Sequence, residues 1–373
     1  MPATPIDDLL AYQLAARHYP GAIVHVERAG QVLAHRAVGR MRPDADAPMH
    51  DEALFKIASL TKAVVSVAAL IFVQERRLGL DAPITEYLPE MAELRMLSGD
   101  RPARAPTVRD LLRHTSGFGY VGEVREAAVR ARVAESDLDT RVPHIDPQTF
   151  IAELARLPLA FEPGSRFRYS PSTDVVGVIL ERIAGMPLAE VLRRKIFESL
   201  GMTQTGFEVD PTGESLLTAA YPEDTAWYAV ERRFGRRTAG KPWMDGGGGG
   251  LVSTIADYAR FARMLADGGV AGGERILGTE LFAEMARDQL PAGLDGPANF
   301  TGPGFGFGLA LAVRLDWGPA AMPCQAGELA WSGVTGTALF VHPKERWFAL
   351  AFSCNTSSRM MARMEFRRAL ARS

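Results

Sequence analysis

The sequence predicts a mixed α/β (α+β) fold: an antiparallel sheet built from both ends of the chain and flanked by helices, with a mainly helical region inserted between its halves. Strand patterns occur near both ends, helix patterns fill the middle, and the apolar segment Ala63–Val73 indicates a helix buried on all sides. We therefore expect residues 1–80 and 245–373 to form a discontinuous sheet domain. Residues 81–244 form the inserted region, with the functional site at the junction.

The composition of the 373 residues is that of an ordinary globular protein: 47% are hydrophobic, 23% are charged, and the formal net charge is -2. Basic residues are scattered, which argues against a nucleic-acid partner. Cys324 and Cys354 are too few for a disulfide framework, and no Cys/His spacing resembles a metal site, so we expect neither metal nor cofactor. Ala63–Val73 is too short to span a bilayer, and residues 1–8 lack the pattern of a secretory signal. We expect a soluble, cytoplasmic protein without a membrane span.

The first elements predicted are a helix and a hairpin. Residues 5–18 form an amphipathic pattern, and Asp7 and Asp8 suit the positive end of a helix dipole. Ala22–Arg28 and Val32–Val38 are rich in strand-forming residues and are separated by a short turn that contains glycine. These two segments are expected at the edge of the antiparallel sheet.

A central helix is expected over Phe55–Glu75, with Ser59 and Lys62 near its N-terminal end. Residues three apart are neighbours on one helix face, so a hydroxyl and an amine would lie side by side. Burial disfavours the charged ammonium, which leaves an amine able to take the serine proton. The 42 basic residues include only five lysines, and a guanidinium, unlike an amine, is not deprotonated in proteins. On this motif alone, a serine helix start followed by a snorkelling lysine fits equally well.

Thr107–Asp110 resembles a capping box and predicts a short helix that ends at His114–Gly117. The charged segment 121–148 is expected to be irregular or helical at the surface. Further helices are expected at Asp146–Leu157, at Thr173–Ala184 with Gly185 as its stop, and at Leu188–Leu200. Residues 208–244 show no clear period.

The last third of the chain begins with five glycines, Gly246–Gly250, which lack the ending of a phosphate-binding loop and indicate a flexible or closely packed turn. A helix follows at Thr254–Leu265, started by Thr254 with Asp257 three residues on. Strands are then expected at Phe307–Leu315, Leu329–Val341 and Arg346–Ser353, and a final helix at Arg359–Leu370.

Four motifs now appear in one order along almost the whole chain: Ser59-Leu60-Thr61-Lys62, Val108–Gly117, Pro163–Ser170 and Trp331-Ser332-Gly333. Together they resemble the serine β-lactamase and penicillin-binding-protein superfamily, and most closely the class C β-lactamase-like esterases known as family VIII carboxylesterases. The resemblance implies a β-lactamase/transpeptidase-like fold and an acyl-transfer reaction through a serine ester.

The resemblance also implies roles for individual residues. Ser59 would be the nucleophile, and Lys62 and Tyr169 would share the work of general base and acid; which takes the first proton stays open, because coupled groups titrate together. The backbone N–H groups of Ser59 and Val334 would hold the oxyanion. Substrate would contact Tyr120 and the Trp331-Ser332-Gly333 strand.

Two departures from the lactamase pattern bear on the substrate. Trp331 stands where lactamases carry a lysine, and Pro171 stands where class C enzymes have an asparagine. A lactam carboxylate beside an indole lacks its charged partner, so lactam turnover is expected to be poor or absent. The sequence therefore favours a carboxylesterase for small or short-chain acyl esters. An amide-directed hydrolase (a β-lactamase or D-amino-acid peptidase), an acyltransferase and an inactive binding homologue stay open as alternatives.

Two further polar residues near these motifs have structural interpretations. His114 follows the short helix that begins at Thr107, and we interpret it as a histidine that stabilises the turn. Asp174 lies at the start of a predicted helix, and we interpret it either as a residue that supports the site from behind or, more safely, as a helix cap.

Overall fold

The computed structural model confirms the α+β fold. It describes residues 4–136, 138, 142–232, 234, 237, 239–294 and 296–373. A seven-stranded sheet has the order β2-β1-β11-β10-β9-β8-β7, and its strand pairs are antiparallel. The two chain ends meet where β1 (Gly21–Arg28) pairs with β11 (Trp347–Ser353). The remaining strands of the sheet are β2 (Gln31–Gly39), β7 (Phe305–Phe307), β8 (Ala312–Arg314), β9 (Leu329–Ser332) and β10 (Thr337–His342).

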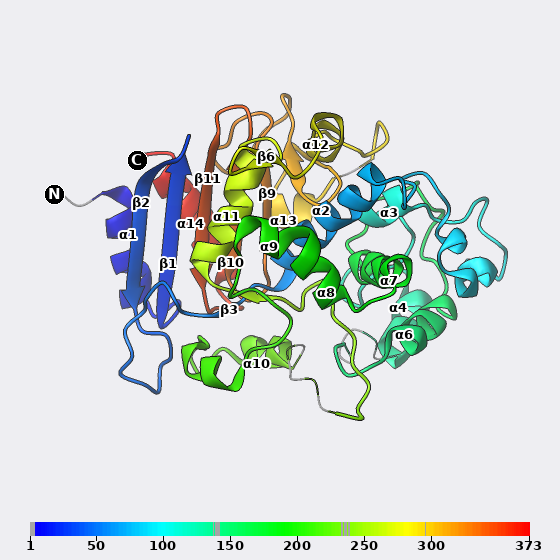
Figure 1. The fold of residues 1–373 in the computed structure, drawn as a ribbon, viewed down its shortest axis with the longest axis horizontal. Helices are drawn as coiled ribbons and strands as arrows, with labels where there is room; N and C mark the ends of the chain where they lie inside the picture. The colour runs from blue at the N-terminus through cyan, green and yellow to red at the C-terminus, as the bar shows by residue number, and fades with distance from the viewer. Residues whose placement is uncertain are drawn as a thin grey trace.

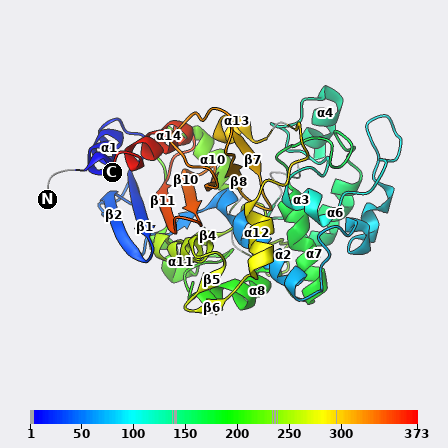
Figure 2. The ribbon, with the colours of Figure 1, turned by 90° about the horizontal axis from the view of Figure 1, so that it is seen from above.

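Helices cover both faces of the sheet (Figures 1 and 2). α1 (Pro5–Ala15) and α14 (Arg359–Leu370) pack together on one face, and α11 (Ile255–Ala266) lies on the other. Aromatic contacts anchor both layers: the ring centroids of Phe340 and Phe366 are 6.4 Å apart on the α14 side. Those of Tyr258 and Phe352 are 5.7 Å apart on the α11 side.

The central helix α2 (Thr61–Gln74) lies between the sheet and the helical region, where it packs against α7 and α8 (Figure 1). Every residue from Thr61 to Phe72 is buried, as the apolar sequence predicted. The other helices are α3 (Val108–Leu112), α4 (Ala127–Ser136), α6 (Pro147–Ala155), α7 (Ser172–Ala184), α8 (Leu188–Leu192), α9 (Glu198–Leu200), α10 (Thr225–Glu231), α12 (Thr279–Ala286) and α13 (Ala298–Thr301). A π-helical turn, Arg193–Phe197, joins α8 to α9.

Several predicted helices are confirmed together with the residues that end them. α14 has the predicted bounds. α3 begins with the capping box, in which the hydroxyl of Thr107 and the carboxylate of Asp110 each accept a backbone N–H from the other residue. α7 stops at Gly185, whose φ of +70° is readily adopted by glycine.

Three predictions about the strands and the central helix are wrong in their bounds. α2 begins at Thr61 rather than Phe55, because Phe55–Lys56 forms strand β3 and pairs with β4 (Val252–Ser253). The strand predicted at Phe307–Leu315 is two short strands, β7 and β8, which pair with each other around a turn. The strand predicted at Leu329–Val341 breaks into β9 and β10.

The middle of the chain is more regular than its sequence suggested. α4 lies within the charged segment 121–148, and α10 lies within 208–244, where no period was recognised. Asp224 caps α10 by accepting the N–H of Trp227. A hairpin of β5 (Val270–Ala271) and β6 (Glu274–Arg275) follows α11. Residues 137 and 139–141 of the first segment, and 233, 235, 236 and 238 of the second, lie outside the described residues.

Asp110 holds the turn that follows α3 and is completely buried. Burial raises its pKa, but hydrogen bonds from Arg104, Thr107, Thr115 and Arg113 outweigh this and lower the pKa to about 2. A carboxylate pKa that is lower in the folded state stabilises the fold above the unfolded value of 3.8. This stabilisation, about 2 kcal/mol, is lost as the pH falls through 3.8 toward 2.

We therefore predict that Asp110→Asn lowers the free energy of unfolding by about 3 kcal/mol at pH 5.5, because four donors lose their charged acceptor. The gap to the wild type should shrink by about 1 kcal/mol at pH 3.0, measured by urea unfolding. The exposed Asp316→Asn should change stability by less than about 0.5 kcal/mol at both pH values. If the difference in unfolding free energy between the wild type and Asp110→Asn were the same at both pH values, the ionised Asp110 carboxylate would not be the source of the stabilisation.

Candidate active site

Ser59 lies in a short 3₁₀ turn, Ala58–Leu60, between β3 and α2. Its side chain is half-buried, whereas both neighbours are buried. Ala58 has φ +47°, a left-handed conformation that is uncommon for alanine and that concentrates at functional sites. The phenol of Tyr258 on α11 donates to the Leu60 carbonyl at 3.0 Å, and this hydrogen bond holds the turn in place. Ser59 therefore lies in a turn that is strained at Ala58 and held in place by the Tyr258 hydrogen bond.

Lys62 occupies the first turn of α2 with 2% of its surface exposed. Its Nζ lies 3.5 Å from the Ser59 Oγ, 3.5 Å from the Tyr120 hydroxyl and 2.5 Å from the carbonyl oxygen of Gly248. A lysine has three N–H donors in its charged form, and here three uncharged oxygens surround it. The predicted pairing of Ser59 with Lys62 is thus present in the structure.

Gly248 brings its carbonyl to Lys62 because the glycine loop packs directly on α7. The Gly248 N–H donates to Asp174 Oδ1 at 2.8 Å, and a Cβ on Gly248 would lie 2.2 Å from Asp174 Oδ2. Of the two interpretations of Asp174, the structure favours the residue that supports the site over the helix cap, because Pro171 is the cap residue of α7 and Asp174 accepts from the Gly248 N–H. Asp174 instead positions the loop that contacts Lys62.

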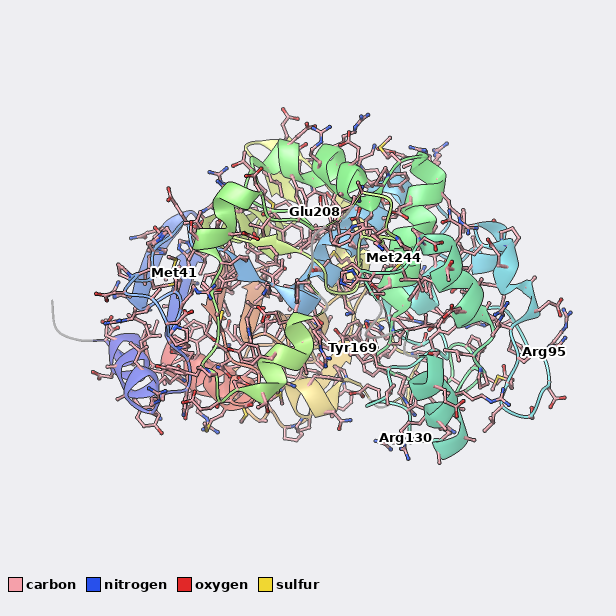
Figure 3. All side chains as sticks on the ribbon, turned by 90° about the horizontal axis from the view of Figure 1, so that it is seen from below. Met41, Arg95, Arg130, Tyr169, Glu208 and Met244 are labelled. Atoms are coloured by element: carbon pink, nitrogen blue, oxygen red, sulfur yellow. The ribbon has the colours of Figure 1, made fainter. Side chains whose placement is uncertain are left out.

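Tyr169 precedes α7 and lies near the middle of the molecule, between the sheet and the helical region (Figure 3). The centroid of its ring is 4.6 Å from the Lys62 Nζ, and its hydroxyl accepts a hydrogen bond from the Trp331 indole at 3.4 Å. Tyr120 lies beside it, with ring centroids 5.6 Å apart. Two phenols therefore flank the lysine, and it is Tyr120 whose hydroxyl is within 3.5 Å of Nζ.

Trp331 on β9 is 4% exposed and forms one wall of the site. Its ring packs against Tyr169 at 5.2 Å, Phe300 at 5.5 Å and Phe307 at 5.3 Å between centroids. These contacts make a largely aromatic surface in the cleft that Ser59 also lines. The indole therefore lines the cleft on the strand that the sequence analysis expected to contact substrate.

The turn between β9 and β10, together with the start of β10, is hydrogen-bonded to the residues that precede Ser59. Thr337 donates its hydroxyl to the Ile57 carbonyl at 3.1 Å, and Thr335 donates to the Lys56 carbonyl at 2.5 Å. A Cβ on Gly333 would meet the Ile57 carbonyl at 2.5 Å, so only glycine allows this approach. Val334, the residue after Gly333, therefore lies next to the Ser59 turn.

These residues line one cleft with about 410 Å³ of water-accessible space. All predicted site residues contribute to it: Ser59, Lys62, Tyr120, Tyr169, Trp331, Ser332, Gly333 and Val334. Sequence reasoning missed Val230 and Phe234 near α10, Arg359 and Met360 on α14, and Glu123 on the Tyr120 loop. No local pattern identified them, because long-range packing brings them to the cleft.

His114 is buried behind Tyr169, with ring centroids 4.8 Å apart. Burial and the charge of Lys62 hold the pKa of His114 well below its ordinary value, so the ring is neutral at pH 7. Its Nδ1 shares a hydrogen bond of 3.1 Å with the Ser170 hydroxyl. The contacts agree with a structural turn histidine that also supports the Tyr169 ring.

Two kinds of feature are absent from the described residues. No group of three or more His, Cys, Asp or Glu side chains there is arranged to hold a metal ion. No helix in the same part of the chain has the length and apolar character needed to cross a bilayer.

A serine hydroxyl beside a buried lysine, at the start of a helix packed between an antiparallel sheet and a helical region, is the arrangement expected from the four sequence motifs. The Beta-lactamase family profile matches residues 6–372, and the chain belongs to this family. Esterase EstB of Burkholderia gladioli is 33% identical over 357 residues, which cover 91% of this chain and 87% of EstB. Protein Rv1367c of Mycobacterium tuberculosis is 35% identical over 332 residues, which cover 85% of this chain and 81% of Rv1367c.

Solved structures give the same result. EstCE1, described as a hydrolase with promiscuous acyltransferase activity, superposes on this chain with a TM-score of 0.83 at 26% identity. The superposition covers 98% of this chain and 97% of the EstCE1 chain. The resemblance to β-lactamase-like esterases is thereby confirmed.

We predict that Gly248→Ala lowers kcat at least about 100-fold, because the added methyl collides with Asp174 and displaces the carbonyl that contacts Lys62. Hydrolysis of p-nitrophenyl butyrate would be measured together with the melting temperature. Gly206→Ala is the matched control, since its methyl meets only the Glu208 backbone at 3.7 Å. Equal kcat for the two variants would show that the loop position is unimportant.

Proposed function

We propose that this protein is a serine carboxylesterase that hydrolyses small or short-chain acyl esters through an acyl-serine intermediate. The observation that carries the proposal is the half-buried Ser59 hydroxyl 3.5 Å from a buried lysine amine in an aromatic cleft. The similarity to Esterase EstB and EstCE1 supports an esterase or acyltransferase of this fold.

In this proposal Ser59 Oγ attacks the ester carbonyl while Lys62, with Tyr169, accepts the serine proton. The backbone N–H groups of Ser59 and Val334 stabilise the oxyanion of the tetrahedral intermediate. The proton then moves to the leaving alcohol, and a water molecule repeats the sequence to release the acid and restore Ser59. The Tyr120 hydroxyl lies close enough to Nζ to hold the lysine in position.

The proposed active site lies where two parts of the chain meet. The sheet domain, residues 1–80 and 245–373, supplies Ser59, Lys62 and the β9 strand, and the inserted region, residues 81–244, supplies the two tyrosines. This division explains why the catalytic set is dispersed in sequence although it is compact in space.

Acyl transfer to an alcohol is the second candidate function. EstCE1 is described as having promiscuous acyltransferase activity, and it resembles this chain over nearly its whole length. The aromatic surface of Tyr169, Phe300 and Trp331 favours an apolar acceptor over water. An acyl-serine that meets such an acceptor gives a new ester instead of an acid.

We predict that Ser59→Ala abolishes hydrolysis of p-nitrophenyl acetate and butyrate and also prevents adduct formation with a fluorophosphonate, detected by intact-mass measurement. Lys62→Arg should lose at least about 1000-fold in kcat/KM, because a guanidinium does not accept a proton. Lys344→Arg, an exposed site, serves as the control and should stay within about twofold of the wild type. Unchanged hydrolysis by Ser59→Ala would refute the proposed mechanism.

A comparison of the two phenols separates their roles. Tyr169→Phe should lower kcat by about 100-fold to 10,000-fold, the usual contribution of general acid–base catalysis. Tyr120→Phe should lower it less than about tenfold, because its hydroxyl contributes one 3.5 Å contact to Lys62. The reverse order of effects, measured with p-nitrophenyl butyrate, would transfer the proton-transfer role to Tyr120.

A further inference from the structure

Two histidines face each other on the hairpin at the edge of the sheet. The antiparallel register places His25 on β1 directly opposite His35 on β2, and their Nδ1 atoms are 3.0 Å apart. This edge of the sheet lies away from the helical region (Figure 1). Among the described residues that line the catalytic cleft, none belongs to β1 or β2. The reaction proposed for Ser59 therefore does not account for the pair.

The second nitrogen of each ring contacts a carboxylate. His25 Nε2 lies 3.3 Å from Glu27 Oε2, and His35 Nε2 lies 2.7 Å from Asp51 Oδ1. An ionised carboxylate only accepts hydrogen bonds, so each Nε2 donates its N–H. Each Nδ1 of a neutral ring then has a lone pair, and the two lone pairs face each other across 3.0 Å. A cation between the two nitrogens, either a proton or a metal ion, removes their repulsion.

The surroundings of the pair favour a metal ion over a proton. A shared proton would make the pair an imidazolium, a charged form that burial disfavours. The His25 side chain is 12% exposed, and this burial lowers its pKa. A metal ion leaves both rings neutral, and it can approach from the side of His35, which is 33% exposed.

The two carboxylates are placed like the outer partners of metal-bound histidines. Such histidines commonly donate their other ring N–H to a carboxylate, which fixes the tautomer and the orientation of the ring. Glu27 is itself held in place, because Arg263 of α11 donates to both of its oxygens at 2.6 Å. Phe348 on β11 stacks on the His25 ring, with centroids 5.6 Å apart. The His25 ring is thus oriented by its neighbours on two strands.

The spacing of the two nitrogens indicates the kind of metal ion. An ion about 2.0–2.1 Å from both Nδ1 atoms, the usual bond length, would subtend an angle of about 91–97° across their 3.0 Å separation. This is close to the angle of about 90° between neighbouring ligands of a square-planar or octahedral ion, and it is smaller than the tetrahedral angle of zinc sites. Each ring must turn toward such an ion, and the partly exposed His35 has room to do so.

We propose that His25 and His35 bind one divalent transition-metal ion through their Nδ1 atoms, with Cu(II) and Ni(II) preferred to Zn(II) and water in the other coordination positions. Because only two side chains bind it, the ion is exchangeable. It joins β1 to β2 and, through Asp51, to the segment 40–54 that leads to β3. This site is independent of the esterase function proposed for Ser59.

Calorimetric titration of the untagged chain, after treatment with a chelator, measures the binding of nickel chloride and zinc chloride. One Ni(II) ion per chain should bind, at least about fivefold more tightly than Zn(II). Saturating Ni(II) should also raise the melting temperature, because the paired histidines exist only in the folded hairpin. The electron paramagnetic resonance spectrum of the Cu(II) complex should show two nitrogen ligands.

Variants test the assignment of the residues. His35→Gln should weaken Ni(II) binding at least about 100-fold, and Asp51→Asn, which keeps both ligands, about 10-fold to 100-fold. The controls are His144→Gln, an exposed histidine outside the hairpin, and Asp44→Asn, an exposed aspartate of the same connecting segment. Each control should change the dissociation constant less than about twofold. None of these variants alters the buried His25, so the hairpin is expected to fold in all of them.

The outcomes decide between a metal site and a shared proton. If the folded wild type bound neither Ni(II) nor Cu(II), the metal site would be overturned and a proton would be the cation between the rings. Equal affinity of the wild type and His35→Gln, or equal effects of Asp51→Asn and Asp44→Asn, would also overturn it, because the ion would then bind elsewhere. These measurements do not involve ester hydrolysis, so the proposed esterase stands or fails separately.

Discussion

The site depends on burying one amine among uncharged acceptors. Lys62 is enclosed by α2 and the glycine loop, and its described hydrogen-bond partners are two hydroxyls and a backbone carbonyl. All three partners are uncharged oxygen acceptors, so hydrogen bonds fix the position of Nζ without an ion pair. The remaining structure can be understood as the means of holding these oxygens in place.

The glycine loop shows what this requires. A Cβ on Gly247 would lie 2.7 Å from the Thr173 carbonyl, and one on Gly250 would lie 2.8 Å from the Phe207 ring. The loop therefore packs against its neighbours more closely than any side chain allows, which brings the Gly248 carbonyl to Lys62. The sequence left a flexible or a closely packed turn open for these glycines, and the structure has the closely packed one. The position of the turn depends on Asp174, which is distant in sequence.

Properties encoded locally were predicted well. The apolar run predicted the buried helix, the capping box predicted α3, and the motif spacing placed Ser59 beside Lys62. Properties that depend on which distant segments of the chain pair with each other were predicted poorly. Phe55–Lys56 forms a strand because it pairs with β4, and β9 ends at Ser332 because the next residue, Gly333, approaches the Ser59 turn. Such contacts are made between distant segments and leave no periodic pattern.

The walls of the cleft are the least predictable part for the same reason. Ser59 and Lys62 are three residues apart, so a short motif reveals them, whereas α10 and α14 reach the cleft only through long-range packing.

Along α14, the end near Arg367 is fixed to the sheet by a buried ion pair with Glu328, and the first turn places Arg359 and Met360 in the lining of the cleft. One helix thus anchors the fold at one end and shapes the cleft at the other. Because the Ser59 turn is held by hydrogen bonds from Thr337 on β10 and Tyr258 on α11 instead, this wall of the cleft and the Ser59 turn are positioned by different elements.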